Sequence, residues 1–279
     1  MRKFFLSFLL FFLLYNFIFC YNNDVFSDFN DISGNLRSSN DILVENWFIY
    51  CTFYFDIYYY HEEAVRDLIK GIDDCFLFII KDLDYIFFNT YKKIKIYVYR
   101  NQRDYFARTK TSHWAGGHAV LHGERTIYTF EQKDLLRNIL AHEVTHLVFD
   151  SYMGTPRHAN LTWLHEGLAV YEDKRFSKKK WNIKRLLKHK LPHVREILKY
   201  NSGLDNNSEQ ISLWYMQVGT LIMFLFEIDR MGFKIFCENF KTYKNIDMAL
   251  SSTYPWNFRN IDELNVAFRK WIYKQKDLI

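Results

Sequence analysis

The stretch LAHEVTHLVFD, residues 140–150, places two histidines four residues apart and a glutamate directly after the first. On a helix, His142 and His146 lie on one face about 6 Å apart, and both imidazoles can then reach one zinc ion at about 2.0–2.1 Å. Glu143 lies about 100° further round the helix, beside such an ion, where a carboxylate can take a proton from water. The alternative is a core helix with two hydrogen-bonded histidines, because so short a motif also arises by chance.

The residues around this motif predict where its helix begins and ends. Asp134 can cap a helix that starts at Leu135, and Gly154 followed by Pro156 can end it. Apolar residues recur at helical spacing and are expected to form the buried stripe of this helix: Leu136, Leu140, Leu147 and Val148.

A second helical segment, residues 160–173 (NLTWLHEGLAVYED), places Glu166 among apolar residues about twenty positions after His146. An unpaired carboxylate would be costly there, whereas a carboxylate bound to zinc is neutralised. Two histidines, one glutamate and a water molecule form the usual open coordination of a hydrolytic zinc ion. Gly167 is expected to let the two helices pack closely at the metal, and His165 is expected to point elsewhere.

Together, HEVTH and WLHEGLAVY resemble the gluzincin zinc metallopeptidases, and most closely the small peptidase-MA-like proteins. Residues 114–130 resemble the loop and edge strand before the zinc helix, 214–232 a Tyr-x-Gln helix that ends at a glycine, and 261–272 the closing helix. The resemblance covers about residues 46–275 and is strongest over 114–232. It implies a zincin-like fold with one Zn²⁺, the ligands His142, His146 and Glu166, and Glu143 as the general base.

The resemblance also suggests supporting residues. Tyr215 stands where related enzymes place a tyrosine that donates a hydrogen bond to the oxyanion, although simple packing remains an alternative, and Gln217 is a weaker candidate. Val170 stands where thermolysin-like relatives carry an aspartate that supports a ligand histidine. Asp150 and Asp173 are possible substitutes for that support.

Several residues before the motif have two interpretations each. Gly116 and Gly117 could let the backbone approach a substrate or could simply make a turn. His118 and His122 repeat the four-residue spacing, but in a β-like segment they are expected to be ordinary polar residues. The strand at 127–130 is expected to hold an extended substrate as an added strand.

The order of predicted elements indicates an α+β fold, with a mixed sheet and helices first, the active-site helix next, and a mostly helical C-terminal half. The N-terminal elements are expected at these positions: one or two strands in 46–60, a helix over 61–88, a strand over 91–100 and a hairpin over 118–130 turning near Gly123 and Glu124. The helices that follow are broken at three stretches: 153–157, 201–208 and 252–256. The domain is expected to span 46–279.

The N-terminal segment 1–20 begins with Arg2 and Lys3 and continues with apolar residues, as a secretory signal does. Three outcomes stay open: a removed signal, an anchor through residues 4–20, or lipid attachment at Cys20. Each predicts export to a periplasmic, other extracytoplasmic or secreted location. Residues 21–45 are polar and are expected to form a linker, and no later stretch is expected to span a membrane.

Composition excludes some classes of partner and site. The 279 residues carry a mild formal net charge of +5 and no nucleic-acid motif, so no nucleic-acid partner is expected. Cys51, Cys75 and Cys237 are odd in number and lack CxxC spacing, so neither a disulfide framework nor a thiolate metal site is indicated, and one disulfide bridge is possible.

The sequence therefore predicts an exported zinc metallopeptidase that acts on peptides or polypeptides. A zinc-containing binding or chaperone module without turnover is the alternative, and a hydrolase of non-peptide amides is a third possibility. Neither the cleavage preference nor the oligomeric state follows from the residues.

Overall fold

The computed structural model describes residues 47–83, 92–111, 115–120, 124–154, 161–200 and 207–275. The chain divides into two units, Met1–Trp47 and Phe48–Ile279, and the elements below all belong to the second. The predictions for the segment 1–20, for Cys20 and for the linker 21–45 lie outside the described residues.

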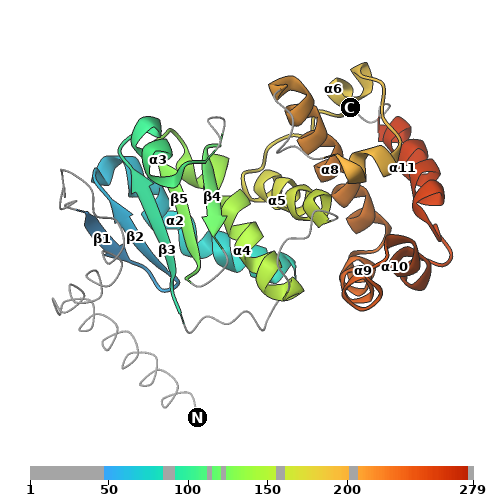
Figure 1. Cartoon of the computed structure of the whole chain (residues 1–279), viewed down its shortest axis with the longest axis horizontal. Helices are drawn as coiled ribbons and strands as arrows, with labels where there is room; N and C mark the ends of the chain where they lie inside the picture. The colour runs from blue at the N-terminus through green and yellow to red at the C-terminus, as the bar shows by residue number, and fades with distance from the viewer. Residues whose placement is uncertain are drawn as a thin grey trace, which may run out of the picture. The chain divides into compact units, whose positions relative to one another are not determined.

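A five-stranded mixed sheet forms the N-terminal part of this unit, in the order β1-β2-β3-β5-β4 (Figure 1). The strands have these bounds: β1 Phe48–Cys51, β2 Phe55–Tyr59, β3 Ile94–Tyr99, β4 Gly117–Val120 and β5 Thr126–Phe130. β2, β3 and β5 run parallel, and β1 and β4 pair antiparallel at the two edges. The predicted hairpin is confirmed as β4 and β5, while Gly123 at its turn lies outside the described residues.

The two faces of the sheet differ because alternate side chains point to opposite sides of each strand. In β3, Ile94, Ile96 and Val98 are buried on one face. The other face carries a row of stacked rings from four adjacent strands. Their centroids lie 4.5, 5.4 and 5.2 Å apart in this order: Tyr58, Tyr97, Tyr128 and His118. The buried aliphatic face is the one against which the long helices pack.

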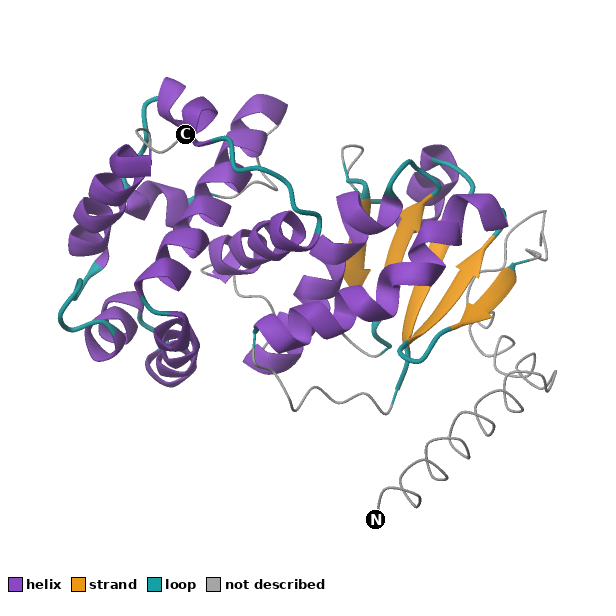
Figure 2. Cartoon of the chain, turned by 180° about the vertical axis from the view of Figure 1, so that it is seen from behind, coloured by secondary structure: helices purple, strands orange, loops and turns teal. Residues whose placement is uncertain are grey.

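Three helical elements cover that aliphatic face (Figure 2): α2 (Glu62–Asp82), the π-helical turn η4 (Leu136–Leu140) and α4 (Ala141–Met153). The predicted helix over 61–88 is confirmed up to Asp82, and residues 84–90 lie outside the described ones. The apolar side chains of α2 are buried at helical spacing: Val65, Leu68, Ile72, Cys75, Phe76 and Ile79. A shorter helix, α3 (Gln102–Thr109), packs on β3 and β5.

The C-terminal half is helical, which completes the predicted α+β organisation. Its helices have these bounds: α5 Thr162–Phe176, α6 Ile183–Lys188, α7 Val194–Lys199, α8 Ser208–Ile228, α9 Arg230–Tyr243, α10 Ile246–Thr253 and α11 Ile261–Gln275. The expected single helix over 214–232 is instead divided between α8 and α9. The backbone of Asp229, four residues after Leu225, is extended and separates the two helices. Gly232 lies inside α9, so it does not end the first helix.

Two glycines bring α5 and α8 close together. A Cβ atom on Gly167 would lie 2.8 Å from the carbonyl oxygen of Val218, and one on Gly219 would lie 2.5 Å from Cγ1 of Val170. The expectation that Gly167 lets α5 approach the motif helix α4 is therefore wrong. The glycine faces α8 instead, because α5 lies between α4 and α8 and packs on both.

Helix α8 is also long and apolar enough to cross a membrane, with a mean hydropathy of 1.5, contrary to the expectation that no later stretch could do so. Most of its window is buried within the protein, against α5 and α9 among others. Core helices of soluble proteins pass the same length and composition test, so this helix is weak evidence for a span.

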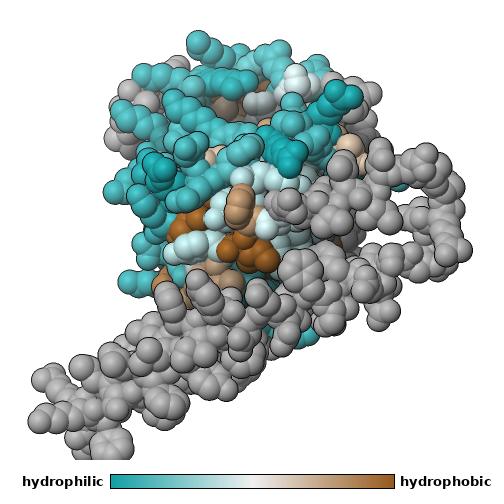
Figure 3. Space-filling view, turned by 90° about the vertical axis from the view of Figure 1, so that its left-hand side faces the viewer, coloured by the Kyte–Doolittle hydropathy of each residue, from teal (hydrophilic) through white to brown (hydrophobic). Residues whose placement is uncertain are grey.

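The outer edge of the sheet at β1 is apolar at its surface. Phe48, Ile49 and Tyr50 are 62%, 50% and 44% exposed. Figure 3 views the molecule from this side, and apolar surface appears there between polar regions.

The three cysteines Cys51, Cys75 and Cys237 are free thiols, so the possible disulfide bridge is not formed among them.

A charged group of three residues ties α2, α5 and α9 together. Asp82, at the end of α2, forms ion pairs with both Arg175 of α5 and Arg230 of α9. Glu172, also on α5, is fully buried, and neither of its carboxylate oxygens has a hydrogen-bond partner among the described residues. Burial raises the pKa of Glu172 to about 8, and the charge of Arg230 only partly opposes this effect. The side chain is therefore mostly neutral at pH 7.

The native protein is expected to lose stability as the pH rises, because the buried Glu172 carboxyl resists becoming charged. Glu172→Gln is expected to prevent this loss. With a folded-state pKa of about 8 against an ordinary 4.5, the folded state is stabilised fully below pH 4.5, and this stabilisation is lost as the pH rises towards 8. At about 1.4 kcal/mol per pH unit, the variant gains roughly 3 kcal/mol over the native chain at pH 7.

Urea unfolding at pH 5, 7 and 8.5 measures this difference. The two free energies of unfolding should be similar at pH 5 and should diverge above it. Parallel pH profiles for the native chain and Glu172→Gln would mean that the carboxylate is already charged or solvated in the folded state.

Candidate metal centre

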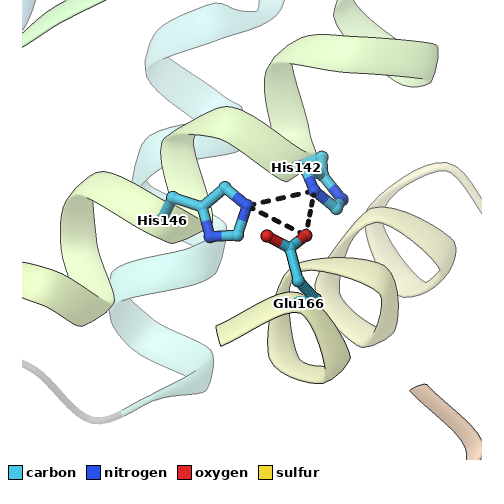
Figure 4. Close-up of side chains that lie close together, drawn as sticks. All are labelled: His142, His146 and Glu166. Carbon is cyan, nitrogen blue, oxygen red and sulfur yellow. Dashed lines mark hydrogen bonds and ion pairs between the residues drawn. The ribbon is translucent and has the colours of Figure 1, made fainter. Parts of the chain in front are cut away.

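His142, His146 and Glu166 point towards one another from two neighbouring helices, α4 and α5 (Figure 4). The Nε2 atoms of the two histidines are 3.1 Å apart. Oε2 of Glu166 lies 3.2 Å from Nε2 of His142 and 3.4 Å from Nε2 of His146. Three ligand atoms of the kinds that bind zinc thus form a small triangle.

The size of this triangle fits a zinc ion. In a tetrahedral site with bonds of about 2.0–2.1 Å, ligand atoms lie roughly 3.3–3.5 Å from one another. The three measured separations are 3.1, 3.2 and 3.4 Å, which differ from that value by a few tenths of an ångström at most. Within the part of the chain that the structure describes, the cluster includes no further His, Cys, Asp or Glu. Three protein ligands leave one corner of a tetrahedron for water or substrate.

Local structure sets the two histidines on one face of α4. The helix ends as predicted, because Gly154 adopts a left-handed φ of 64° and donates its N–H to the carbonyl of Asp150. Its beginning differs from the prediction. Asp134 has a φ of 53° and accepts hydrogen bonds through its backbone carbonyl from Arg137 and Asn138, and the N-cap residue Leu135 makes no side-chain cap. The π-helical turn η4 then leads directly into α4, and such turns are frequent at functional sites.

Electrostatics favour a charged Glu166 carboxylate and a basic His142 imidazole in this cluster. Burial opposes the charge of Glu166, but His146 and His142 hold the pKa of its carboxyl well below the ordinary value. Burial alone would lower the pKa of His142, yet the Glu166 carboxylate, and more weakly Glu143 and Asp173, raise it. An anionic oxygen beside two imidazoles is a suitable environment for a divalent cation.

Glu143 follows His142 on α4 and is 8% exposed. Besides acting on His142, its charge adds to the burial that raises the pKa of Tyr105. The Tyr105 hydroxyl lies 2.8 Å from Nδ1 of His118 on β4. Glu143 is therefore near both the metal cluster and the edge strand β4, and it is not itself part of the ligand triangle.

Tyr215 of α8 lies beside the cluster. Its ring centroid is 6.2 Å from that of His142, and the two rings meet edge to face at 64°. Gln217, the weaker candidate, is 5% exposed and lines a separate cavity with Trp214 and other residues of α7 and α8. Of these two residues, Tyr215 is the one whose side chain contacts a candidate ligand, His142.

A second polar pair joins the two ligand helices, and sequence reasoning missed it. Nδ1 of His165 lies 2.7 Å from Oδ1 of Asp150, and both side chains are buried. The sequence carried a signal for this pair, because Asp150 follows His146 by four residues and so continues the face of the motif. His165 is outside the triangle and pairs with Asp150, one of the two possible substitutes for the supporting aspartate.

Val170 stands where thermolysin-like enzymes carry a supporting aspartate. Its side chain packs against Gly219 on α8. Asp173, the other possible substitute, contacts Lys179 at 3.1 Å and the Ser177 hydroxyl at 3.3 Å. The carboxylate of Asp173 therefore makes its described contacts with residues after α5.

The strand before the motif helix also differs from its prediction. β5 is paired on both sides, with β3 and β4, so it cannot take a substrate strand along its length, and β4 is the edge strand. A Cβ atom on Gly116 or Gly117 would lie 2.4 or 2.7 Å from the side chain of Ile139. The two glycines therefore let β4 lie against η4. His118 contacts Tyr105, as expected of an ordinary polar residue, and His122 lies outside the described residues.

Comparison with known proteins gave one family. The family model described as the Peptidase MA superfamily matches residues 79–274, well over half of the chain. The matched range contains all three residues of the triangle as well as Glu143 and Tyr215. A search among curated proteins found no match to this sequence.

Proposed function

Because the chain belongs to the Peptidase MA superfamily, we propose that it is a zinc-dependent peptidase in which His142, His146 and Glu166 hold the metal. The observation that carries this proposal is the triangle of ligand atoms with sides of 3.1, 3.2 and 3.4 Å. It lies next to a buried carboxylate, Glu143, that is not a ligand. This is the arrangement that hydrolysis by an activated water requires.

The residues divide the chemical work among them. Zinc bound at the triangle would supply a positive charge that acidifies a water molecule and polarises the substrate carbonyl. Glu143 takes the proton from the attacking water and later gives it to the leaving amine. The Tyr215 hydroxyl, on the side of His142, donates a hydrogen bond to the oxyanion that develops.

An extended substrate would bind at β4. This strand is the sheet edge nearest to α4, since Gly117 packs against Ile139 at the start of the motif helix. An edge strand presents backbone N–H and carbonyl groups with which an added peptide can pair. The peptide would then run along the sheet edge past Glu143, which places the scissile bond near the triangle.

The same proposal includes export of the peptidase. The charged start and apolar run of residues 1–20 support a periplasmic, other extracytoplasmic or secreted location, with a membrane tether through residues 4–20 if the segment is kept. Its substrates would then be peptides or polypeptides outside the cytoplasm.

Removal of metal tests the activity itself. The purified protein should cleave members of a broad peptide mixture, lose this cleavage after treatment with a zinc chelator, and regain it when Zn²⁺ is restored. Mass spectrometry of the products measures the cleavage. Stoichiometric zinc without any cleavage would favour a binding or chaperone module instead, and cleavage restricted to non-peptide amides would change the substrate class.

Tyr215→Phe is expected to lower kcat by about ten- to a hundredfold and to leave KM nearly unchanged, because the lost hydrogen bond forms only as the oxyanion develops. The ring, which packs beside His142, is retained in this variant. Steady-state kinetics with one cleaved peptide separates the two constants. An unchanged kcat would assign Tyr215 to packing alone.

A further inference from the structure

A cavity of about 420 Å³ lies between α7 and α8, outside the metal triangle. Six of the residues that line it provide apolar walls and one amide: Pro192, Ile197, Tyr200, Leu213, Trp214 and Gln217. Charged residues of both signs also line it, among them Lys190 and Glu209. The volume falls within the range of roughly 300–1,000 Å³ that is usual for binding pockets.

Continuous ring contacts join this cavity to the metal centre. Leu213, Trp214 and Gln217 share one face of α8, because they are three and four residues apart. The Trp214 ring lies 5.2 Å from the ring of Tyr215, which in turn lies 6.2 Å from that of His142. The cavity therefore lies on a face of α8 that is adjacent to the face carrying Tyr215.

The walls of the cavity are held in place by their own contacts. The Trp214 indole donates a hydrogen bond of 2.9 Å to the carbonyl of Ile197, and its ring packs against that of Tyr200 at 5.4 Å. Trp214 is 2% exposed and Ile197 is 1% exposed. A wall fixed in this way can select an occupant by its shape, because it does not need to rearrange on binding.

Gln217 is the unusual residue of this cavity. Gln217 is 5% exposed and lines the cavity, so its amide belongs to the cavity wall. An amide offers two donors and one acceptor, and buried polar groups in folded proteins nearly always have a partner. The Gln217 amide is therefore a group in the cavity wall that can form a hydrogen bond with an occupant.

We propose that the cavity binds one side chain of the peptide substrate close to the scissile bond, and that it prefers tyrosine. The aromatic and aliphatic walls would hold the ring, and the Gln217 amide would form a hydrogen bond with the phenolic hydroxyl. The mixed charges of Lys190 and Glu209 give no advantage to a charged side chain. This inference rests on the proposed peptidase function and names its substrate class.

The test uses peptides that differ at single positions on either side of the cleaved bond, with Tyr, Phe or Ala at each. At one position, the native protein should show a kcat/KM for Tyr about fivefold above that for Phe, the size of one net hydrogen bond, and higher still above that for Ala. Gln217→Leu should remove the preference for Tyr over Phe and keep the turnover of the Phe peptide. Gln102→Leu makes the same change at an exposed position of α3, outside the cavity, and should leave the preference as it is.

Leu213→Trp provides a second measurement, because it fills the cavity from a half-buried wall position. It should lower kcat/KM for Tyr and Phe peptides by at least about tenfold and spare the Ala peptide. Selectivity unchanged by both Gln217→Leu and Leu213→Trp, in a protein that still cleaves peptides, would overturn the inference and leave the peptidase proposal intact. Absence of cleavage by the native, zinc-loaded protein would overturn both.

Discussion

Glu143→Gln is expected to lower kcat for peptide hydrolysis by at least about a thousandfold and to leave the zinc content of the protein unchanged. An amide of the same size cannot accept the proton of the attacking water, and general-base catalysis contributes about 10²–10⁴-fold. Zinc should stay bound because Glu143 lies outside the ligand triangle of His142, His146 and Glu166. Elemental analysis of the purified variant, beside its peptide kinetics, measures both quantities.

A matched substitution separates the loss of the base from a general effect of removing a charge. Glu263→Gln makes the same change on α11, where the native carboxylate pairs with Arg259 at the surface, and it should keep full activity. If Glu143→Gln kept a tenth or more of the native kcat, another group would have to act as the base. If it lost zinc together with activity, Glu143 would have to be assigned to holding the metal.

The local parts of the structure followed from the sequence. Apolar residues at helical spacing predicted α2 and the buried side of α4, and alternation predicted β3, because both signals lie within one element. The positions of His142, His146 and Glu166 could be chosen for similar reasons. The four-residue spacing places two imidazoles on one helix face, and a carboxylate among apolar neighbours needs a compensating charge.

Features that depend on contacts between distant elements could not be predicted in the same way. The sequence indicated that 126–130 forms a strand, but only the pairing order shows that β5 is internal and β4 is the edge. A glycine indicates that two elements approach closely but does not identify the second element. Gly167 faces α8 rather than α4. The place of Gln217 in a cavity wall likewise becomes visible only when α7 and α8 enclose that cavity.

The beginning of the motif helix shows a third limit. An Asp before a helical pattern predicts a side-chain cap, but Asp134 uses its backbone carbonyl, and a π-helical turn follows. A π-helical turn contains an extra residue per turn, and the apolar pattern of LLRNIL is compatible with either helix type. The sequence therefore predicted the presence of this helix more securely than the geometry of its first turn.

Glu166→Ala is expected to lower the affinity for zinc by at least about a thousandfold and to abolish peptide hydrolysis. Loss of a residue that merely supports a ligand costs about 10–100-fold in affinity, and loss of a ligand itself should cost more. The two remaining imidazoles would then hold the ion without the carboxylate charge that lies 3.2 and 3.4 Å from them. Competition with a chromogenic chelator measures the affinity, and circular dichroism checks that the helices remain.

Glu172→Gln is the matched control for this change, because it alters a buried carboxyl six residues later on the same helix. It should bind zinc as the native protein does, since Glu172 lies outside the triangle. Zinc loss in Glu166→Ala but not in Glu172→Gln would show that the effect belongs to the ligand position and not to the loss of any buried carboxyl from α5. If Glu166→Ala retained stoichiometric zinc with native affinity, a group other than this carboxylate would have to complete the site. The roles given to Glu143 and Tyr215, which are argued from their places around the same ion, would then have to be assigned again.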